Sequence, residues 1–206
     1  IKDEIKGTIV FIFQPAEEGA PKGEEGGAKL MIDEGVLDNP SVDAIIGLHI
    51  SQGSKVGTAS YRALGFMASA QRFDIHIQGK QTHGARPWAG VDPIVVGAQI
   101  INGLQTIVSR QIDITQHPAV VTVGSFAAGV RNNIVPASAQ LTGTIRTFDA
   151  NVRQSIHQKI RAIAEQTAAS MGAVATVEID PGVPVTFNDA QPVSYTHLTL
   201  PTRLPV

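Results

Sequence analysis

Three side chains that can bind a divalent cation follow two apolar segments in the first quarter of the chain. Glu17 and Glu18 are adjacent and come a few residues after the apolar segment 8–13, and His49 directly follows the apolar segment 44–48. Segments that are apolar on both faces are typical of strands buried in a parallel sheet. Carboxylate oxygens and imidazole nitrogens both bind zinc and similar ions. The pattern therefore indicates a metal site at the ends of two strands.

The residues between these segments predict how the strands are connected. Residues 27–34 have the composition of a short helix that is closed by Gly35. A strand, a helix and a second strand in this order predict parallel neighbouring strands. Ligands of such sheets bind at the carboxyl ends of the strands, so we expect Glu17, Glu18 and His49 at one edge.

Neighbouring acids on a loop can divide the chemistry between them. One carboxylate can bind a metal while the other takes the proton from a metal-bound water. Taken alone, an adjacent Glu pair is more often a solvated loop feature, and a His at a strand end is more often a structural group. Their position beside buried strands favours a site, because a carboxylate is costly to hold near a core without a cation. Two ligands are too few for a catalytic metal, so we expect further ligands from sequence outside this chain.

Composition excludes several classes of protein. The chain has 206 residues, of which 43% are hydrophobic and 17% are charged, with a formal net charge of −2. There is thus no electrostatic case for binding nucleic acid or an anionic membrane. The absence of cysteine excludes disulfides and thiolate ligands. The chain begins at Ile1 without a Met or a leader, and we interpret it as a fragment of a longer protein and expect a cytoplasmic location.

From about Phe66 the apolar pattern changes to alternation, as in residues 73–77, 141–145 and 173–179. Alternation with one apolar face predicts an antiparallel sheet that is covered on one side. Two helices can cover it. The first begins at Asp92-Pro93, and the second begins near Asp149 or Asn151. On the first helix we expect a buried stripe made of Ile94, Ala98, Ile101, Leu104 and Val108.

The order strand, helix, strand, strand, helix, strand predicts a ferredoxin-like, β-α-β-β-α-β domain. We therefore expect an α/β protein with a largely parallel sheet in a partial catalytic domain, residues 1–67, and an inserted α+β domain, residues 68–182. Residues 183–190 return as a strand to the first domain. Residues 191–206 contain three prolines and no helical stripe, and we predict that they are a non-native tail.

Three polar residues of the second domain are further candidates, each with a structural alternative. His83 is either a turn residue or a donor that stabilises charge on a reacting carbonyl oxygen. Asn133 lies in a loop between two strands, and the composition of the loop alone favours a turn-forming role for this residue. Arg146 is either a solvated strand residue or the partner of a substrate carboxylate.

Together these segments resemble the metal-dependent amidohydrolase and peptidase family that includes hippurate hydrolase, aminoacylase, bacterial carboxypeptidases and indole-acetyl-amino-acid hydrolases. The resemblance covers about residues 7–188. Its specific pieces are Phe13–Gly19, Gly47–His49, Gly79–Pro87, Val91–Ile94, Gly124–Pro136 and Gly143–Arg146.

The resemblance implies metal-dependent hydrolysis of an amide bond in N-acyl amino acids or small peptides. It implies that Glu17 is the general base and that Glu18 and His49 are ligands of two divalent ions, either zinc or manganese, with cobalt and nickel as further candidates. It implies that His83 and Asn133 hold the scissile carbonyl and that Arg146 faces the substrate carboxylate.

The resemblance also implies that residues 68–182 act as a lid and as the interface of a homodimer, in which His83 serves the neighbouring subunit's site. The family's other metal ligands lie outside residues 1–206, so we expect the fragment itself to be inactive. Two alternatives stay open: a non-catalytic dimerisation module and a small-molecule binding module derived from the hydrolase. A pure dimerisation module would bind no metal and still dimerise.

Overall fold

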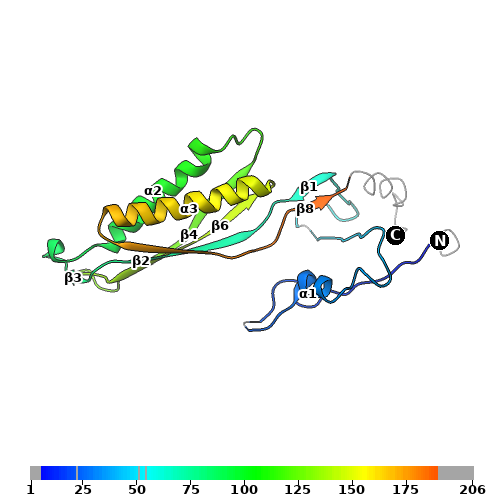
Figure 1. Ribbon diagram of the computed structural model, residues 1–206, viewed down its shortest axis with the longest axis horizontal. Coiled ribbons are helices and arrows are strands. Elements are labelled where there is room, and N and C mark those ends of the chain that lie inside the picture. Colours follow the sequence, from blue (N-terminus) through cyan, green and yellow to red (C-terminus); the bar gives the residue numbers. More distant parts are fainter. Residues whose placement is uncertain (1–5, 22, 51, 54, 190–206) are drawn as a thin grey trace. The chain divides into compact units, whose positions relative to one another are not determined.

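The structure is a computed structural model that describes residues 6–21, 23–50, 52–53 and 55–189. The chain divides into two compact units, Ile1–Lys55 and Val56–Val206 (Figure 1). The predicted tail, residues 191–206, lies outside the described residues.

The first unit contains one helix, α1 (Gly27–Asp33), among the residues that the structure describes. The N–H of Glu34 donates to the carbonyl of Leu30 at 2.9 Å, and the N–H of Gly35 donates to the carbonyl of Ile32 at 2.9 Å. Gly35 then takes a φ of 83°, which a residue without Cβ adopts readily. The predicted helix and its closing glycine are confirmed.

The structure corrects the prediction of a parallel sheet in this unit. Residues 8–13 and 44–48 are not strands, and Phe11, Phe13 and Leu48 are 80%, 86% and 94% exposed. A strand that is apolar on both faces needs neighbouring strands for its backbone groups and a covering layer on each face. The described residues of this unit supply neither.

The second unit is built around a four-stranded antiparallel sheet with two long helices (Figure 1). Along the chain the order is strand, helix, strand, strand, helix, strand, and across the sheet the order is β4-β6-β2-β7. This is the split β-α-β arrangement that the alternation predicts. The elements are β2 (Gln71–Gln78), α2 (Pro93–Gln111), β4 (Ala119–Ala128), β6 (Ser138–Thr147), α3 (Ala150–Ser170) and β7 (Val174–Ile179).

Two short antiparallel ribbons extend this unit. β1 (Leu64–Met67) pairs with β8 (Thr186–Asn188), and β3 (Thr82–His83) pairs with β5 (Ile134–Val135). A 3-10 turn, η2 (Pro87–Ala89), follows β3. The predicted return strand is thus present as β8. The predicted domain boundaries and the role of residues 68–182 as a lid stay predictions.

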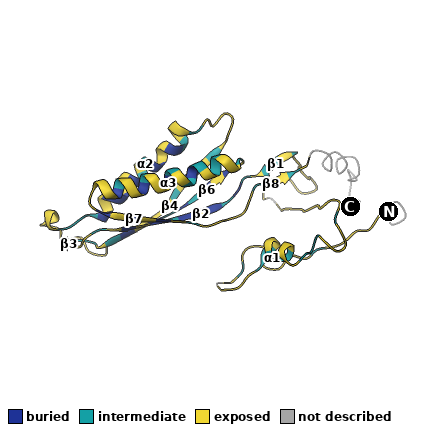
Figure 2. Cartoon of the chain, in the orientation of Figure 1, coloured by how far each residue is buried: buried dark blue, intermediate teal, exposed yellow. Residues whose placement is uncertain are grey.

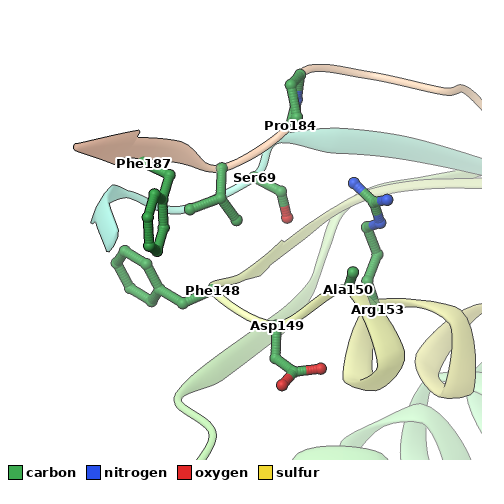
Figure 3. Close-up of a pocket in the computed structure, with 8 residues that line it drawn as sticks. Ser69, Phe148, Asp149, Ala150, Arg153, Pro184 and Phe187 are labelled. Atoms are coloured by element: carbon green, nitrogen blue, oxygen red, sulfur yellow. The ribbon is translucent and has the colours of Figure 1, made fainter. Parts of the chain in front are cut away.

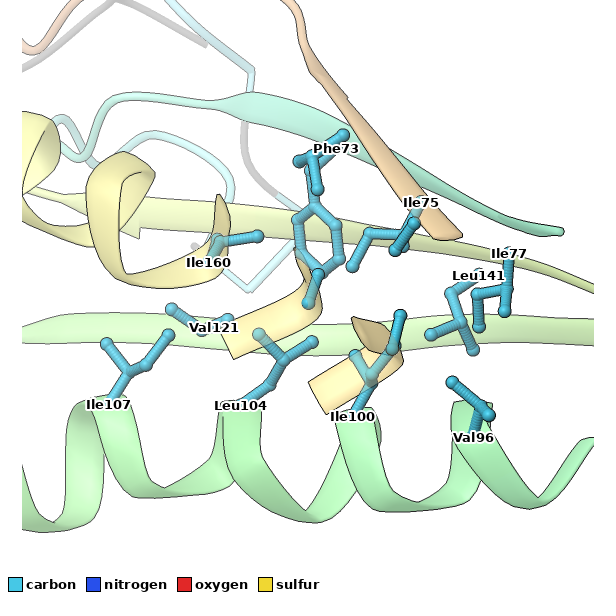
Figure 4. Close-up of a cluster of buried hydrophobic side chains, with 14 of the residues drawn as sticks. Phe73, Ile75, Ile77, Val96, Ile100, Leu104, Ile107, Val121, Leu141 and Ile160 are labelled. Atoms are coloured by element: carbon cyan, nitrogen blue, oxygen red, sulfur yellow. The ribbon is translucent and has the colours of Figure 1, made fainter. Parts of the chain in front are cut away.

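The core lies between one face of the sheet and the two helices, while the other face stays exposed (Figure 2). Phe73, Ile75 and Ile77 of β2 are fully buried, as their alternation predicts. In Figure 4 these side chains and Leu141 of β6 meet Ile100 and other residues of α2. Burying each such side chain contributes about 1.5–3 kcal/mol before the entropy of ordering is subtracted.

The predicted buried stripe of α2 is only partly right: Leu104 is fully buried, and Ile101 and Val108 are partly buried against the core. Ile94 is 40% exposed, whereas the buried set is Pro93, Val96, Gly97, Ile100, Leu104 and Ile107. Both sets keep helical spacing, because apolar residues surround this helix on more than one side. Gly97 decides between them, since a Cβ there would lie 2.6 Å from Cζ of Phe126. The glycine face therefore approaches the sheet.

Both long helices begin at an aspartate cap. Asp92 Oδ1 accepts the N–H of Ile94 at 2.8 Å and that of Val95 at 3.4 Å, and Pro93 occupies the first helical position. Asp149 Oδ1 likewise accepts two backbone N–H groups, so α3 begins after Asp149 rather than after Asn151. Hydrogen bonds from Val152 and Asn151 hold the pKa of Asp149 below its usual value.

The sheet is closely packed at Gly143 in β6. A Cβ at this position would lie 2.1 Å from Cζ of Phe73 and 2.3 Å from the carbonyl oxygen of Thr122. We expect Gly143→Ala to lower the free energy of unfolding by about 1–3 kcal/mol, because the extra methyl group forces a core side chain or strand to move. Urea denaturation measures the change.

Gly124→Ala is the matched control in the neighbouring strand. A Cβ at Gly124 would meet its nearest atom, the carbonyl oxygen of Thr142, at 3.9 Å, so little destabilisation is expected. Equal losses for the two variants would contradict the packing explanation.

Candidate functional site

Glu17 and Glu18 lie in a turn, residues 15–18, and both are exposed. The N–H of Gly19 donates to the carbonyl of Ala16 at 3.1 Å, and the N–H of Gly27 donates to the carbonyl of Pro15 at 2.9 Å. The turn is therefore tied to the start of α1. His49 is exposed and lies outside regular structure.

The described residues do not assemble the predicted metal site. Among them, no group of three or more His, Cys, Asp or Glu side chains lies close enough to hold a metal ion. The donor types of Glu18 and His49 fit a borderline divalent ion, but a catalytic site needs at least three protein ligands. The roles of Glu17, Glu18 and His49 stay predictions.

The structure does bring two predicted residues together in the second unit. β3 and β5 pair so that His83 is opposite Ile134, the residue that follows Asn133. The N–H of Gly84 donates to the carbonyl of Asn133 at 2.8 Å. These strands come from segments about 50 residues apart, so neither His83 nor Asn133 is only a local turn residue. We call residues 79–91 and 129–138 the tip.

The ring of His83 has a defined hydrogen bond. The N–H of Ala85 donates to Nδ1 of His83 at 3.1 Å. Nδ1 therefore acts as an acceptor, and in the neutral ring the proton resides on Nε2. The side chain is exposed, so Nε2–H is free to donate to a carbonyl oxygen of a ligand.

An open hollow of about 570 Å³ lies beside Asn133. Arg131, Gln81 and Ser138 contribute polar groups to its lining, and Val130 and Ile134 contribute apolar surface. The sequence motif indicates Asn133 but not Arg131. Whether Arg131 lies near a ligand depends on the pairing of β5 with β3, which no local sequence pattern reveals.

Arg146 lies far from His83 and Asn133 within one chain. It is exposed near the end of β6, opposite Val120 of β4. Ser138, the first residue of the same strand, belongs to the tip. Eight residues of strand separate the two positions by about 26 Å. The structure therefore does not bring Arg146 together with the other two predicted residues in one chain.

A second hollow, of about 230 Å³, lies between the start of α3 and the segment that leads to β8 (Figure 3). Phe148, Arg153 and Phe187 are among its lining residues. The hydroxyl of Ser69 is buried in its wall and donates to the carbonyl of Thr147 at 3.0 Å. None of the predicted site residues lines this hollow.

The chain matches the model of one protein family, described as peptidase family M20/M25/M40, over residues 1–197. The chain belongs to this family. This confirms the family relationship that the motifs indicate. An N-acetyl-L-cysteine deacetylase of Bacillus subtilis is 40% identical over 91% of this chain and 43% of its own length. An N-acyl-L-amino acid amidohydrolase of Geobacillus stearothermophilus is 38% identical over 88% of this chain and 47% of its own length.

A solved structure supports the same fold. The YXEP protein of Bacillus subtilis, described as a dinuclear metal-binding peptidase of the M20 family, is 36% identical, with a TM-score of 0.64 over 86% of this chain and 42% of its own chain. This chain therefore spans less than half the length of these relatives. Among the residues that the structure describes, no helix is long and apolar enough to cross a membrane.

The hydrogen bond from Ala85 predicts the tautomer of His83. We expect the neutral ring to carry its proton on Nε2, because Nδ1 already accepts a hydrogen bond. Long-range ¹⁵N–¹H NMR correlation of the histidine rings distinguishes the two tautomers, with His83→Gln to assign the signal. A neutral ring protonated on Nδ1 would contradict the geometry.

Proposed function

We propose that the protein containing this chain hydrolyses the amide bond of N-acyl amino acids or small peptides with the help of two divalent metal ions. Membership of the family carries this proposal, supported by relatives named as deacetylase and amidohydrolase. The placement of His83 beside Asn133 adds a pair of groups suited to hold a carbonyl.

The residues of this chain then have separate roles. Glu17 takes a proton from the attacking water and returns it to the leaving amine. Nε2–H of His83 and the side-chain amide of Asn133 donate to the carbonyl oxygen as negative charge develops on it. Glu18 and His49 supply two ligands of the metal site, which the described residues do not complete. When bound, the metal ions polarise the carbonyl and lower the pKa of the water.

The distance along β6 indicates that two chains build one site. An N-acyl amino acid has the size of a dipeptide and spans about 7 Å. It cannot reach from the tip to Arg146, which are about 26 Å apart along the strand. If His83, Asn133 and Arg146 contact the same substrate, Arg146 comes from one chain and the tip comes from its partner.

The edges of the sheet suggest where a second copy binds. Within the described sheet, β4 pairs only with β6, and none of its ten residues is charged. The opposite edge is protected, because the guanidinium of Arg161 donates to the carbonyl of Val177 in β7. Two β4 strands that pair antiparallel across a two-fold axis would be self-complementary. This supports a homodimer through the second unit.

The assignment of the base is tested in the full-length protein. We expect Glu17→Gln to lower kcat for N-acetyl amino acids by about 10²–10⁴-fold, because the amide cannot accept the proton of the water. Glu24→Gln, an exposed change in the loop that follows, is the control and leaves kcat unchanged. Full turnover by Glu17→Gln would rule out this base.

A complementation experiment tests the two-chain site. His83→Ala and Arg146→Ala are each expected to lose activity as homodimers. After the two proteins are mixed and subunits exchange, half of the molecules are mixed dimers with one intact site each, so activity recovers to about a quarter of the wild-type value. The readout is turnover of an N-acetyl amino acid.

The controls of this experiment separate the alternatives. A mixture of His83→Ala with His83→Ala/Arg146→Ala restores nothing, because no intact site can form. If the first mixture also stays inactive although exchange is demonstrated, the two-chain site is wrong. A dimer that binds no metal and cleaves no N-acyl amino acid would instead support the non-catalytic dimerisation module.

A further inference from the structure

The tip of the second unit carries three basic side chains and no acidic one. Lys80, Arg86 and Arg131 are exposed there, and residues 79–91 and 129–138 contain no Asp or Glu. The ion pairs Lys29–Asp33 and Arg72–Asp74 lie outside the tip. A cluster of one sign attracts ligands of the opposite sign and raises their local concentration.

Of the three cations at the tip, Arg131 lines a cavity. It lines the open hollow of about 570 Å³ together with Asn133, two residues further along the chain. The remaining lining includes apolar surface from Val130, Ile134 and Pro136. A hollow that combines apolar surface, neutral polar groups and a guanidinium suits a short aliphatic chain that ends in a carboxylate.

The proposed roles of the neighbouring residues define which part of the substrate reaches this hollow. The carbonyl that Asn133 and His83 would hold belongs to the acyl group. The atoms attached to that carbonyl on the side away from the nitrogen are the acyl chain. The carboxylate of the amino acid is assigned to Arg146, which is remote from the tip of the same chain.

We infer that the hollow receives the acyl chain of the substrate and that Arg131 favours acyl groups ending in a carboxylate, such as a succinyl group. This inference rests on the proposed function, because it places the acyl chain by the carbonyl that His83 and Asn133 hold. Lys80 and Arg86 contribute to the field around the hollow, and Arg131 makes the direct contact.

The experiment compares three substrates of the full-length protein: an N-succinyl amino acid, the same compound with its distal carboxylate converted to an amide, and an N-acetyl amino acid. We expect Arg131→Gln to lower kcat/KM for the succinyl substrate about tenfold, the size of a lost charge-assisted hydrogen bond. The amide and acetyl substrates change less than twofold. Arg110→Gln, an exposed change at the other end of α2, is the charge-matched control.

Two results would overturn the inference. An equal loss of kcat/KM for all three substrates would assign Arg131 a structural role, and an unchanged kcat/KM for the succinyl substrate would exclude the direct contact. Equilibrium binding of the same compounds, followed by calorimetry, keeps the two proposals separate. If the wild-type protein hydrolyses none of them, the proposed function fails. Binding then still tests the role of Arg131. We expect the wild type to bind the succinyl compound about tenfold more tightly than its amide, and Arg131→Gln to remove that preference.

Discussion

The pairing of β2 with β6 is the interaction on which the second unit depends. It runs without interruption from Gln78 opposite Ser138 to Gln71 opposite Ile145. This register places Phe73, Ile75 and Ile77 on the same face as Leu141 and Ile145, where α2 and α3 cover them. Shifting the register by one residue would move each of these side chains to the exposed face, so the core itself holds the register in place.

The same register determines where the functional candidates lie. β6 begins at the tip, and Arg146 lies about 26 Å along it from Ser138, so one straight strand separates His83 and Asn133 from Arg146. A strand is stiff, because its backbone groups are bonded to β2 on one side and β4 on the other. One chain therefore cannot fold Arg146 back to His83. If His83, Asn133 and Arg146 contact one substrate, a second copy of the chain must supply part of the site.

The first unit shows the opposite situation. Its apolar segments 8–13 and 44–48 have the composition of central strands, yet within the described residues they form no sheet. A segment cannot bury both of its faces by itself, because this requires a covering layer on each face and neighbouring strands. The turn that carries Glu17 and Glu18 is held by its own backbone hydrogen bonds, which is why the turn forms without the sheet.

Local sequence determined the features that depend on local physics. These are the caps Asp92 and Asp149, the glycine after α1, the alternation of β2 and the order of the elements in the second unit. The motifs likewise sufficed to indicate the family. Tertiary structure decided which side of α2 is buried, because more than one apolar stripe fits helical spacing and Gly97 lets the helix approach Phe126 closely. It also decided that the segment of Asn133 pairs with the strand of His83 while Arg146 lies far along β6, because strand pairing joins segments that no periodicity relates.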